Sequence, residues 1–273
     1  MRNLAQAFFL IPMLLVMLAM PARAGDLSSS SATPEDLAII DRGTIKEILK
    51  SDMVMLDNNK RYRLDNILVP PYEEPPAMDE LKREFLNKGV TVYSYPGIEN
   101  SMDRYGLLFA HLVTAKVAWV QQDLVSKGLA WAFSSTSSPD MVETLKLIEE
   151  KARSQRVGFW KNPAYAIKNP ENVGEFINSY QIVEGKIISI SETSGAVFLN
   201  FGKNWKTDFA VKIKSNYLPL FLAEDSDPSS KYDSPLKWKN RFVRIRGWVT
   251  RSNGPLMVLT HKEQMDFLSQ DGE

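Results

Sequence analysis

Apolar residues in this chain recur mostly at alternate positions, in short runs separated by turn-forming residues, a pattern that predicts β-strands. The first half begins with a hairpin series, since Asp57-Asn58-Asn59-Lys60 is a strong turn between two such runs. Helical spacing follows at 78–86, 118–127 and 139–154, where Gly128 ends the second helix. The strands expected here are 43–48, 53–56, 61–67, 90–95 and 107–113.

A second all-β pattern follows a connector that contains Pro163, Pro170 and Gly174. Its expected strands are 182–190, 196–201, 209–213, 241–251 and 257–260, with a short helical piece at 218–222. Five short strands with a helix between the third and fourth suit an oligonucleotide/oligosaccharide-binding (OB) barrel. We therefore predict a mainly β, α+β chain: a five-stranded OB-type barrel with packed helices, then a second OB-like β barrel.

The first residues are typical of a secretory signal. Arg2 supplies the positive charge, 8–20 are apolar, and Ala22-Arg23-Ala24 is a small-x-small cleavage motif. The apolar run is short for a membrane span, so we expect cleavage after Ala24, no stable span afterwards, and a periplasmic or secreted protein. The expected divisions are 1–24 signal peptide, 25–38 flexible segment, 39–161 first barrel, 162–178 connector and 179–273 second barrel.

Charge and cysteine content exclude several functions. The 273 residues carry 33 Lys and Arg against 33 Asp and Glu, and the neutral balance argues against tight, non-specific binding of a polyanion. With no cysteine, the chain has no disulfide, zinc–thiolate site or cysteine nucleophile. The two histidines, His111 and His261, lie far apart in sequence and give little support to a histidine metal site. We expect His111, in an apolar strand, to be packed.

Four motifs in order carry a resemblance to a known family. They are Tyr62-Arg63-Leu64 leading to Val69-Pro70-Pro71, then 103–107 (Asp-Arg-Tyr-Gly-Leu), 124–131 (Leu-Val-Ser-Lys-Gly-Leu-Ala-Trp) and Gly158-Phe159-Trp160. Over roughly residues 39–160 the chain resembles the staphylococcal-nuclease-like (thermonuclease) family. That resemblance implies a small barrel with packed helices which hydrolyses phosphodiester bonds with calcium, two arginines, a glutamate and aspartates.

Not all the catalytic groups that the resemblance implies are present. Arg63 matches the first arginine and Asp52 can match one calcium-binding aspartate. Leu68 stands in place of the other aspartate, Pro71 in place of the glutamate, and Leu107 in place of the second arginine. Leucine offers a cation no oxygen and a phosphorane no charge.

Substitutes for the missing groups are available nearby. Glu73 and Glu74 lie just downstream and can act as replacement carboxylates. Arg104 and Tyr105 can still hold phosphate, or form only a turn. No metal or cofactor is expected, calcium excepted if the chain is an active nuclease.

The second barrel interleaves aromatic and basic residues, which on an OB barrel can stack and track single-stranded nucleic acid. The same alternation is also what any half-exposed strand shows. The candidate contacts here are Lys239, Arg241, Arg244, Arg246 and Trp248.

Three functions remain open on the sequence. The preferred one is an exported, catalytically impaired binding module whose ligand is single-stranded nucleic acid, a glycan or an envelope protein. The alternatives are a divergent calcium-dependent nuclease and a structural or assembly protein of the envelope. The substituted motif positions favour binding over cutting.

Overall fold

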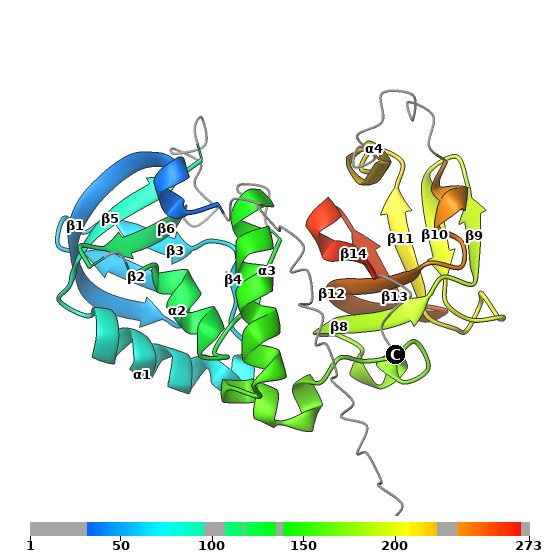
Figure 1. The fold of residues 1–273 in the computed structure, drawn as a ribbon, viewed down its shortest axis with the longest axis horizontal. Coiled ribbons are helices and arrows are strands. Elements are labelled where there is room, and N and C mark those ends of the chain that lie inside the picture. Colours follow the sequence, from blue (N-terminus) through cyan, green and yellow to red (C-terminus); the bar gives the residue numbers. More distant parts are fainter. Residues whose placement is uncertain (1–31, 96–106, 117, 135–138, 223–233, 269–273) are drawn as a thin grey trace, which may run out of the picture. The chain divides into compact units, whose positions relative to one another are not determined.

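The computed structural model describes residues 32–95, 107–116, 118–134, 139–222 and 234–268. Its first part is a closed five-stranded barrel in the order β1-β2-β3-β6-β5 (Figure 1). All neighbours are antiparallel except β3 and β6, which run parallel with Arg63 beside Phe109. The strands are β1 (Ala38–Lys50), β2 (Met53–Leu56), β3 (Arg61–Leu64), β5 (Gly89–Ser94) and β6 (Leu108–Thr114).

Helix α1 (Glu74–Phe85) connects β3 to β5 and contributes to the barrel core. Its apolar residues Ala77, Leu81 and Phe85 are buried with Ile45 and Leu112 of the strands. They recur at four-residue spacing, so one face of the helix lies against the barrel. The helix begins earlier than the sequence pattern predicts, because Pro75 and Pro76 occupy its first turn, where proline is tolerated.

Helices α2 (Val120–Ser126) and α3 (Pro139–Ser154) follow the barrel, with the short pair β4 (Ile67–Leu68) and β7 (Trp131–Ala132) beside them. Two glycines fix this arrangement. Gly128 (φ 60°) and Gly158 (φ 55°) lie in back-to-back contact, and a Cβ on either would come within 2.2 Å of a backbone oxygen. Two of the four sequence motifs therefore meet in one backbone contact, closed by the Phe159 N–H to Gly128 carbonyl bond of 2.9 Å.

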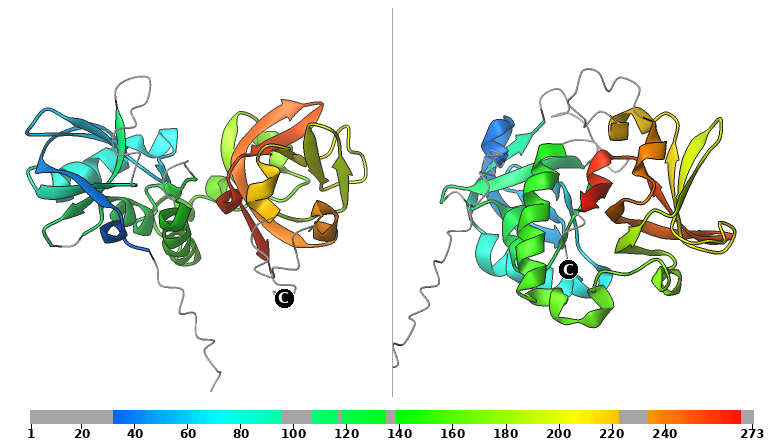
Figure 2. Two further views of the ribbon diagram at one scale, coloured as in Figure 1. Left: turned by 90° about the horizontal axis from the view of Figure 1, so that it is seen from above. Right: turned by 45° about the vertical axis from the view of Figure 1, so that its right-hand side comes forward.

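The second part, from β8 onward, is again built mainly of strands (yellow-green to red in Figure 2), and its pairings repeat the strand order of the first. Antiparallel pairs join β9 to β10, β10 to β11 and β12 to both β13 and β8, while β11 and β13 run parallel. Since β8 and β9 are consecutive pieces of one strand path, these pairings return to their start, as in the first barrel. The strands are β8 (Ser179–Lys186), β9 (Ser189–Glu192), β10 (Ala196–Asn200), β11 (Ala210–Lys214), β12 (Phe242–Ser252) and β13 (Gly254–Leu259).

Helix α4 (Leu218–Leu222) lies between the third and fourth strand positions of this second ring, as α1 does in the first. Val197, Leu199, Val211 and Ile213 alternate inward along β10 and β11 and are almost completely buried. The prediction of a mixed α+β chain, with an OB-type barrel followed by a second β domain, is confirmed.

Helix α3 and strand β12 are joined by ion pairs. Arg246 of β12 lies 2.6 Å from Glu149 of α3, and both side chains are only 3% exposed. Arg244 lies 2.7 Å from Glu150 and 2.6 Å from Glu184 of β8. An apolar cluster that includes Trp131, Phe159 and Tyr180 accompanies these pairs. Residues 31–273 accordingly cluster as one unit.

The structure adds ordered elements in three places where the sequence pattern did not specify any. Residues 32–38, expected to be flexible, contain the 3₁₀ turn η1 (Pro34–Asp36) and the first residue of β1, and the Ala32 carbonyl accepts a bond from Thr144. Residues 162–178 are packed as well: their turns are η4 (Pro163–Tyr165) and η5 (Val173–Phe176), and Val173 is fully buried. Strand β14 (Met265–Leu268), which the pattern did not predict, pairs with β12.

Within the described ranges, no helix is long and apolar enough to cross a membrane. The expected signal peptide, residues 1–24, lies outside those ranges.

We expect Arg246→Met to lower the free energy of unfolding by about 3–5 kcal/mol, because it leaves Glu149 as an unpaired charge in a buried position. Urea denaturation of the purified chain measures the loss. Arg251→Met, at an exposed position on the same strand, is the matched control and should change stability by about 0.5 kcal/mol or less. Adding Glu149→Leu to Arg246→Met should recover much of the loss. Equal stability of Arg246→Met and Arg251→Met would contradict this prediction.

Candidate functional site

Arg63 and Asp52 lie together at one edge of the first barrel. Arg63 is on β3, Asp52 is in the turn between β1 and β2, and the pairing of Met53 with Arg63 brings them side by side. The Arg63 Nε to Asp52 Oδ2 distance is 3.3 Å, and both side chains are about one-third exposed, at 28% and 30%. The guanidinium also lies 5.8 Å from the ring centre of Phe109 on β6. The two residues that match the nuclease pattern thus neutralise each other.

Leu68 and Leu107 serve packing. Leu68 is half-buried on β4, opposite Trp131, and packs against the aromatic cluster of Trp131 and Phe159. Leu107 is 5% exposed, just before β6. Both positions where the resemblance implies a charged group are therefore occupied by apolar side chains in contact with the protein interior.

The two carboxylates considered as substitutes have other surroundings. Glu73 lies near the phenol of Tyr165: burial, together with the Glu73 charge, raises the pKa of Tyr165 to about 12. Glu74 is an exposed first residue of α1. Pro71 begins the turn η2 (Pro71–Glu73) and presents no acid there.

The residues present do not fit the calcium that the resemblance implies. Calcium takes six to eight oxygen ligands, mostly carboxylates and carbonyls. The matching carboxylate, Asp52, is paired with Arg63, and Leu68 supplies no oxygen. Across the described part of the chain, no three His, Cys, Asp or Glu residues come together as metal ligands.

A buried polar cluster lies behind this edge of the barrel, around His111 of β6. His111 is 1% exposed, its Nε2 lies 3.1 Å from Asn66 Oδ1, and its ring packs edge-on to Trp119. Burial lowers the pKa of His111 to about 4, against the opposing effect of the Asp65 charge. The ring is therefore neutral at physiological pH and holds structure together, as expected for a packed histidine.

A second acid, Asp41, is also held by neighbours. Burial alone would raise its pKa, but hydrogen bonds from Tyr62 (2.6 Å) and Asn58 (2.9 Å) bring the pKa of Asp41 down to about 2. Asp41 is thus a structural carboxylate that ties β1 to β3.

The basic candidates of the second ring divide into two groups. Arg246 is buried against Glu149 and Arg244 is held between Glu150 and Glu184, so these two predicted nucleic-acid contacts both have carboxylate partners within the chain. Lys239 and Arg241 are exposed, with Arg241 lying over Phe267.

Trp248 is 48% exposed and packs against Tyr180. Arg104 and Tyr105 lie outside the described residues.

The acidic partners Glu149 and Glu150 were missed by the sequence analysis. Their signal was present: two adjacent glutamates in α3 and two arginines at alternate positions of β12. Charges of opposite sign on two half-exposed faces can pair or remain solvated, and only the packing of α3 against β12 distinguishes the two.

The fold and this edge define a class: an OB-type barrel with nuclease-like packing motifs, in which an arginine–aspartate pair remains and the other charged positions are apolar. Residues 56–162 match the family model described as staphylococcal nuclease homologue, and the resemblance predicted from the motifs is confirmed over that stretch. The match spans less than half of the 273 residues. No curated protein matches the chain.

We expect acid to destabilise the chain through His111. Its pKa falls from 6.5 to about 4 on folding, so between these pH values the unfolded chain binds a proton at His111 and the folded chain does not. The contribution of neutral His111 to the free energy of unfolding is complete above pH 6.5 and is lost as pH falls towards 4. Urea midpoints between pH 7.5 and 4 should therefore fall more steeply for the parent than for His111→Gln. Parallel curves would contradict the assignment.

Proposed function

We propose that this chain is a binding protein built on a nuclease-like barrel, and that it does not hydrolyse phosphodiester bonds. The observation that supports this most directly is Leu68, which packs against Trp131 at the position of a calcium-binding aspartate. Hydrolysis of this kind needs an ion to activate water and cations to stabilise the phosphorane. Removing one such stabilising group costs about a hundred- to a thousand-fold in rate.

The loss is compounded because the affected groups act together. Leu107 is buried where the second arginine is implied, and the charge of Glu73, a candidate replacement acid, acts on the phenol of Tyr165. Losses among groups that act as a unit leave little residual chemistry for the others to support. We therefore propose binding without turnover as the activity of the whole chain.

Export belongs to the same proposal. The amino-terminal sequence supports a secreted or periplasmic location, and the absence of cysteine means that the chain relies on packing there. The ligands consistent with this location are single-stranded nucleic acid, a glycan or an envelope protein.

A divergent nuclease is the second candidate, and one observation favours it: Arg63 and Asp52 remain in contact. An arginine released from Asp52 by a bound phosphate could still stabilise charge. The exposed faces of both residues leave that exchange sterically open.

Cleavage of DNA separates the two candidates. The chain lacking residues 1–24 should give no calcium-dependent cleavage of single- or double-stranded DNA, relative to a chelator control, over hours at micromolar protein. Calcium should not raise its melting temperature, because the described residues form no cluster of ligands for the ion.

The overturning result is calcium-dependent cleavage that disappears in Arg63→Ala. Arg61→Ala, at an exposed position on the same strand, is the control that shows whether such a loss is specific to Arg63. Cleavage that survives Arg63→Ala would indicate a contaminating nuclease.

A further inference from the structure

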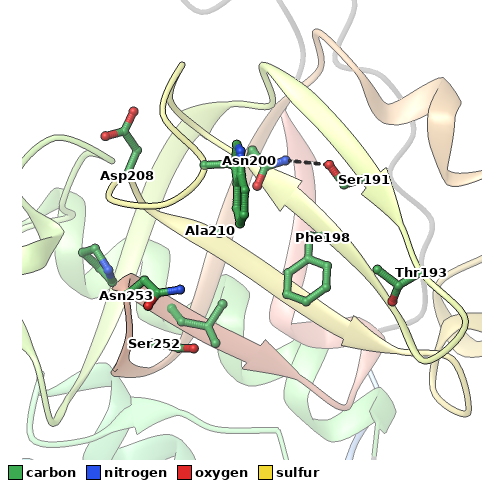
Figure 3. Close-up of a pocket in the computed structure, with 11 residues that line it drawn as sticks. Ser191, Thr193, Phe198, Asn200, Asp208, Ala210, Ser252 and Asn253 are labelled. Atoms are coloured by element: carbon green, nitrogen blue, oxygen red, sulfur yellow. Dashed lines mark hydrogen bonds between the residues drawn. The ribbon is translucent and has the colours of Figure 1, made fainter.

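The second ring carries a cavity on the outer face of β9, β10 and β11 (Figure 3). Its volume is about 430 Å³, within the range of sites that hold small ligands. The loop between β9 and β10 bounds it at Thr193, and the turn between β12 and β13 bounds it at Ser252 and Asn253. On an OB barrel, this is the face formed by strands two and three and the loops beside them.

Aromatic rings and neutral polar groups line this cavity. Phe198 projects from β10 into its centre, and Trp205, 65% exposed, lies in the loop between β10 and β11. Asn200 Nδ2 donates to the hydroxyls of Ser189 and Ser191, each at 3.3 Å. The other polar lining groups are Thr193, Ser252 and Asn253.

The charge of the lining residues distinguishes an uncharged ligand from a polyanion such as nucleic acid. Of the 11 lining residues one is charged, and it is an acid, Asp208. Single-stranded nucleic acid requires a positively charged groove along its phosphates. Lys206 and Lys212 are nearby, but each ammonium lies 5.5 Å from a ring centre, over Trp205 and Phe198 respectively, and neither lines the cavity.

The cavity is held in shape before any ligand arrives. Asp208 accepts bonds from the Asn204 N–H (2.9 Å) and the Thr207 hydroxyl (3.0 Å), which fixes the loop that carries Trp205. That loop packs against the β12–β13 turn so closely that a Cβ on Gly254 would lie 2.5 Å from the Thr207 carbonyl oxygen. A preformed site loses little conformational entropy when it binds.

We infer that this face binds an uncharged oligosaccharide, with sugar rings stacked on Phe198 and Trp205 and sugar hydroxyls bonded to Asn200, Ser191 and Asn253. The apolar C–H face of a pyranose matches an aromatic ring, and its hydroxyls match amide and hydroxyl partners. The inference deepens the proposed function, since it gives the binding protein a ligand class. It rests on the proposed function in one respect: the bound ligand is not cleaved.

Calorimetric titration tests the inference with three defined uncharged probes, tetra-N-acetylchitotetraose, maltohexaose and cellohexaose, at 50 and 300 mM salt. At least one should bind saturably, with an affinity that salt leaves unchanged. Trp205→Ala and Phe198→Ala should each weaken that binding at least about tenfold. Trp205→Phe keeps a ring and should retain most of the affinity.

Phe242→Ala is the matched control, because Phe242 is also an exposed aromatic residue of the second ring, at 43%, but does not line the cavity. It should bind like the parent. Circular dichroism melts confirm that each variant is folded, which is expected for Trp205→Ala because that side chain is largely exposed.

Three results would overturn the inference: no saturable binding of any of the three sugars, sugar binding that Trp205→Ala leaves intact, or binding of the oligonucleotide dT12 that weakens with salt and is lost in Trp205→Ala. The third would assign the face to single-stranded nucleic acid. DNA cleavage is measured separately, so a failed sugar titration and a failed proposal of binding without cutting remain distinguishable.

Discussion

The buried ion pair between Arg246 and Glu149 is the constraint on which the link between α3 and β12 depends. Removing two charges from water costs several kcal/mol per ion, and the attraction between them repays this only when geometry is good and remaining polar atoms are bonded. Arg246 Nη1 donates to Glu149 at 2.6 Å and to the Ala132 carbonyl at 3.2 Å, but Arg246 Nε and Glu149 Oε1 are buried without a hydrogen-bond partner, so the condition is met only in part. Burial nevertheless raises the pKa of Glu149, which shows how strongly the site disfavours an unpaired charge.

Such a pair specifies register. Successive residues of a strand point to opposite faces. A slip of β12 by one residue would therefore place Arg246 in the apolar core of the second ring and move Ile245 out of that core. Ile245 is fully buried in that core, and Arg244 on the other face is bonded to Glu150 and Glu184. Packing and charge thus select the same alignment of β12. In this alignment Arg244 and Arg246, which the sequence pattern indicates as nucleic-acid contacts, are paired with glutamates of α3 and β8.

Local patterns predicted the elements well where one physical signal dominated. The helix at 139–154 and the glycine stop at 128 follow from apolar spacing and from a left-handed backbone that glycine tolerates. Strand β14 was missed because its four residues gain their pairing only from β12, which is distant in sequence. The turn at Pro34–Asp36 was not predicted because its Ser- and Pro-rich surroundings resemble a linker, whereas contacts such as that of Ala32 with Thr144 involve residues far along the chain.

The candidate site shows the same division. Arg63 and Asp52 were each selected as candidate nuclease-site residues from motif positions, and a local hairpin brings them together. The roles of Glu73, Arg244 and Arg246 could not be predicted, since their partners Tyr165, Glu150 and Glu149 are set by tertiary packing. Phe198 and Asn200 were overlooked because alternation along β10 marks them only as outward-facing. Their significance depends on the loops that the fold places beside them.

The two rings share one strand order, and this equivalence separates what the fold supplies from what the residues supply. In each ring the third strand, β3 or β11, runs parallel to the fifth. On the outer face of the first ring, Arg63 of β3 is paired with Asp52. On the outer face of the second ring, Phe198 of β10 lies opposite Lys212 of β11. A fold positions a face, and only its side chains decide its chemistry. The two faces therefore differ in chemistry although the strand order is the same: the first carries a paired arginine and aspartate, and the second an aromatic ring beside a lysine.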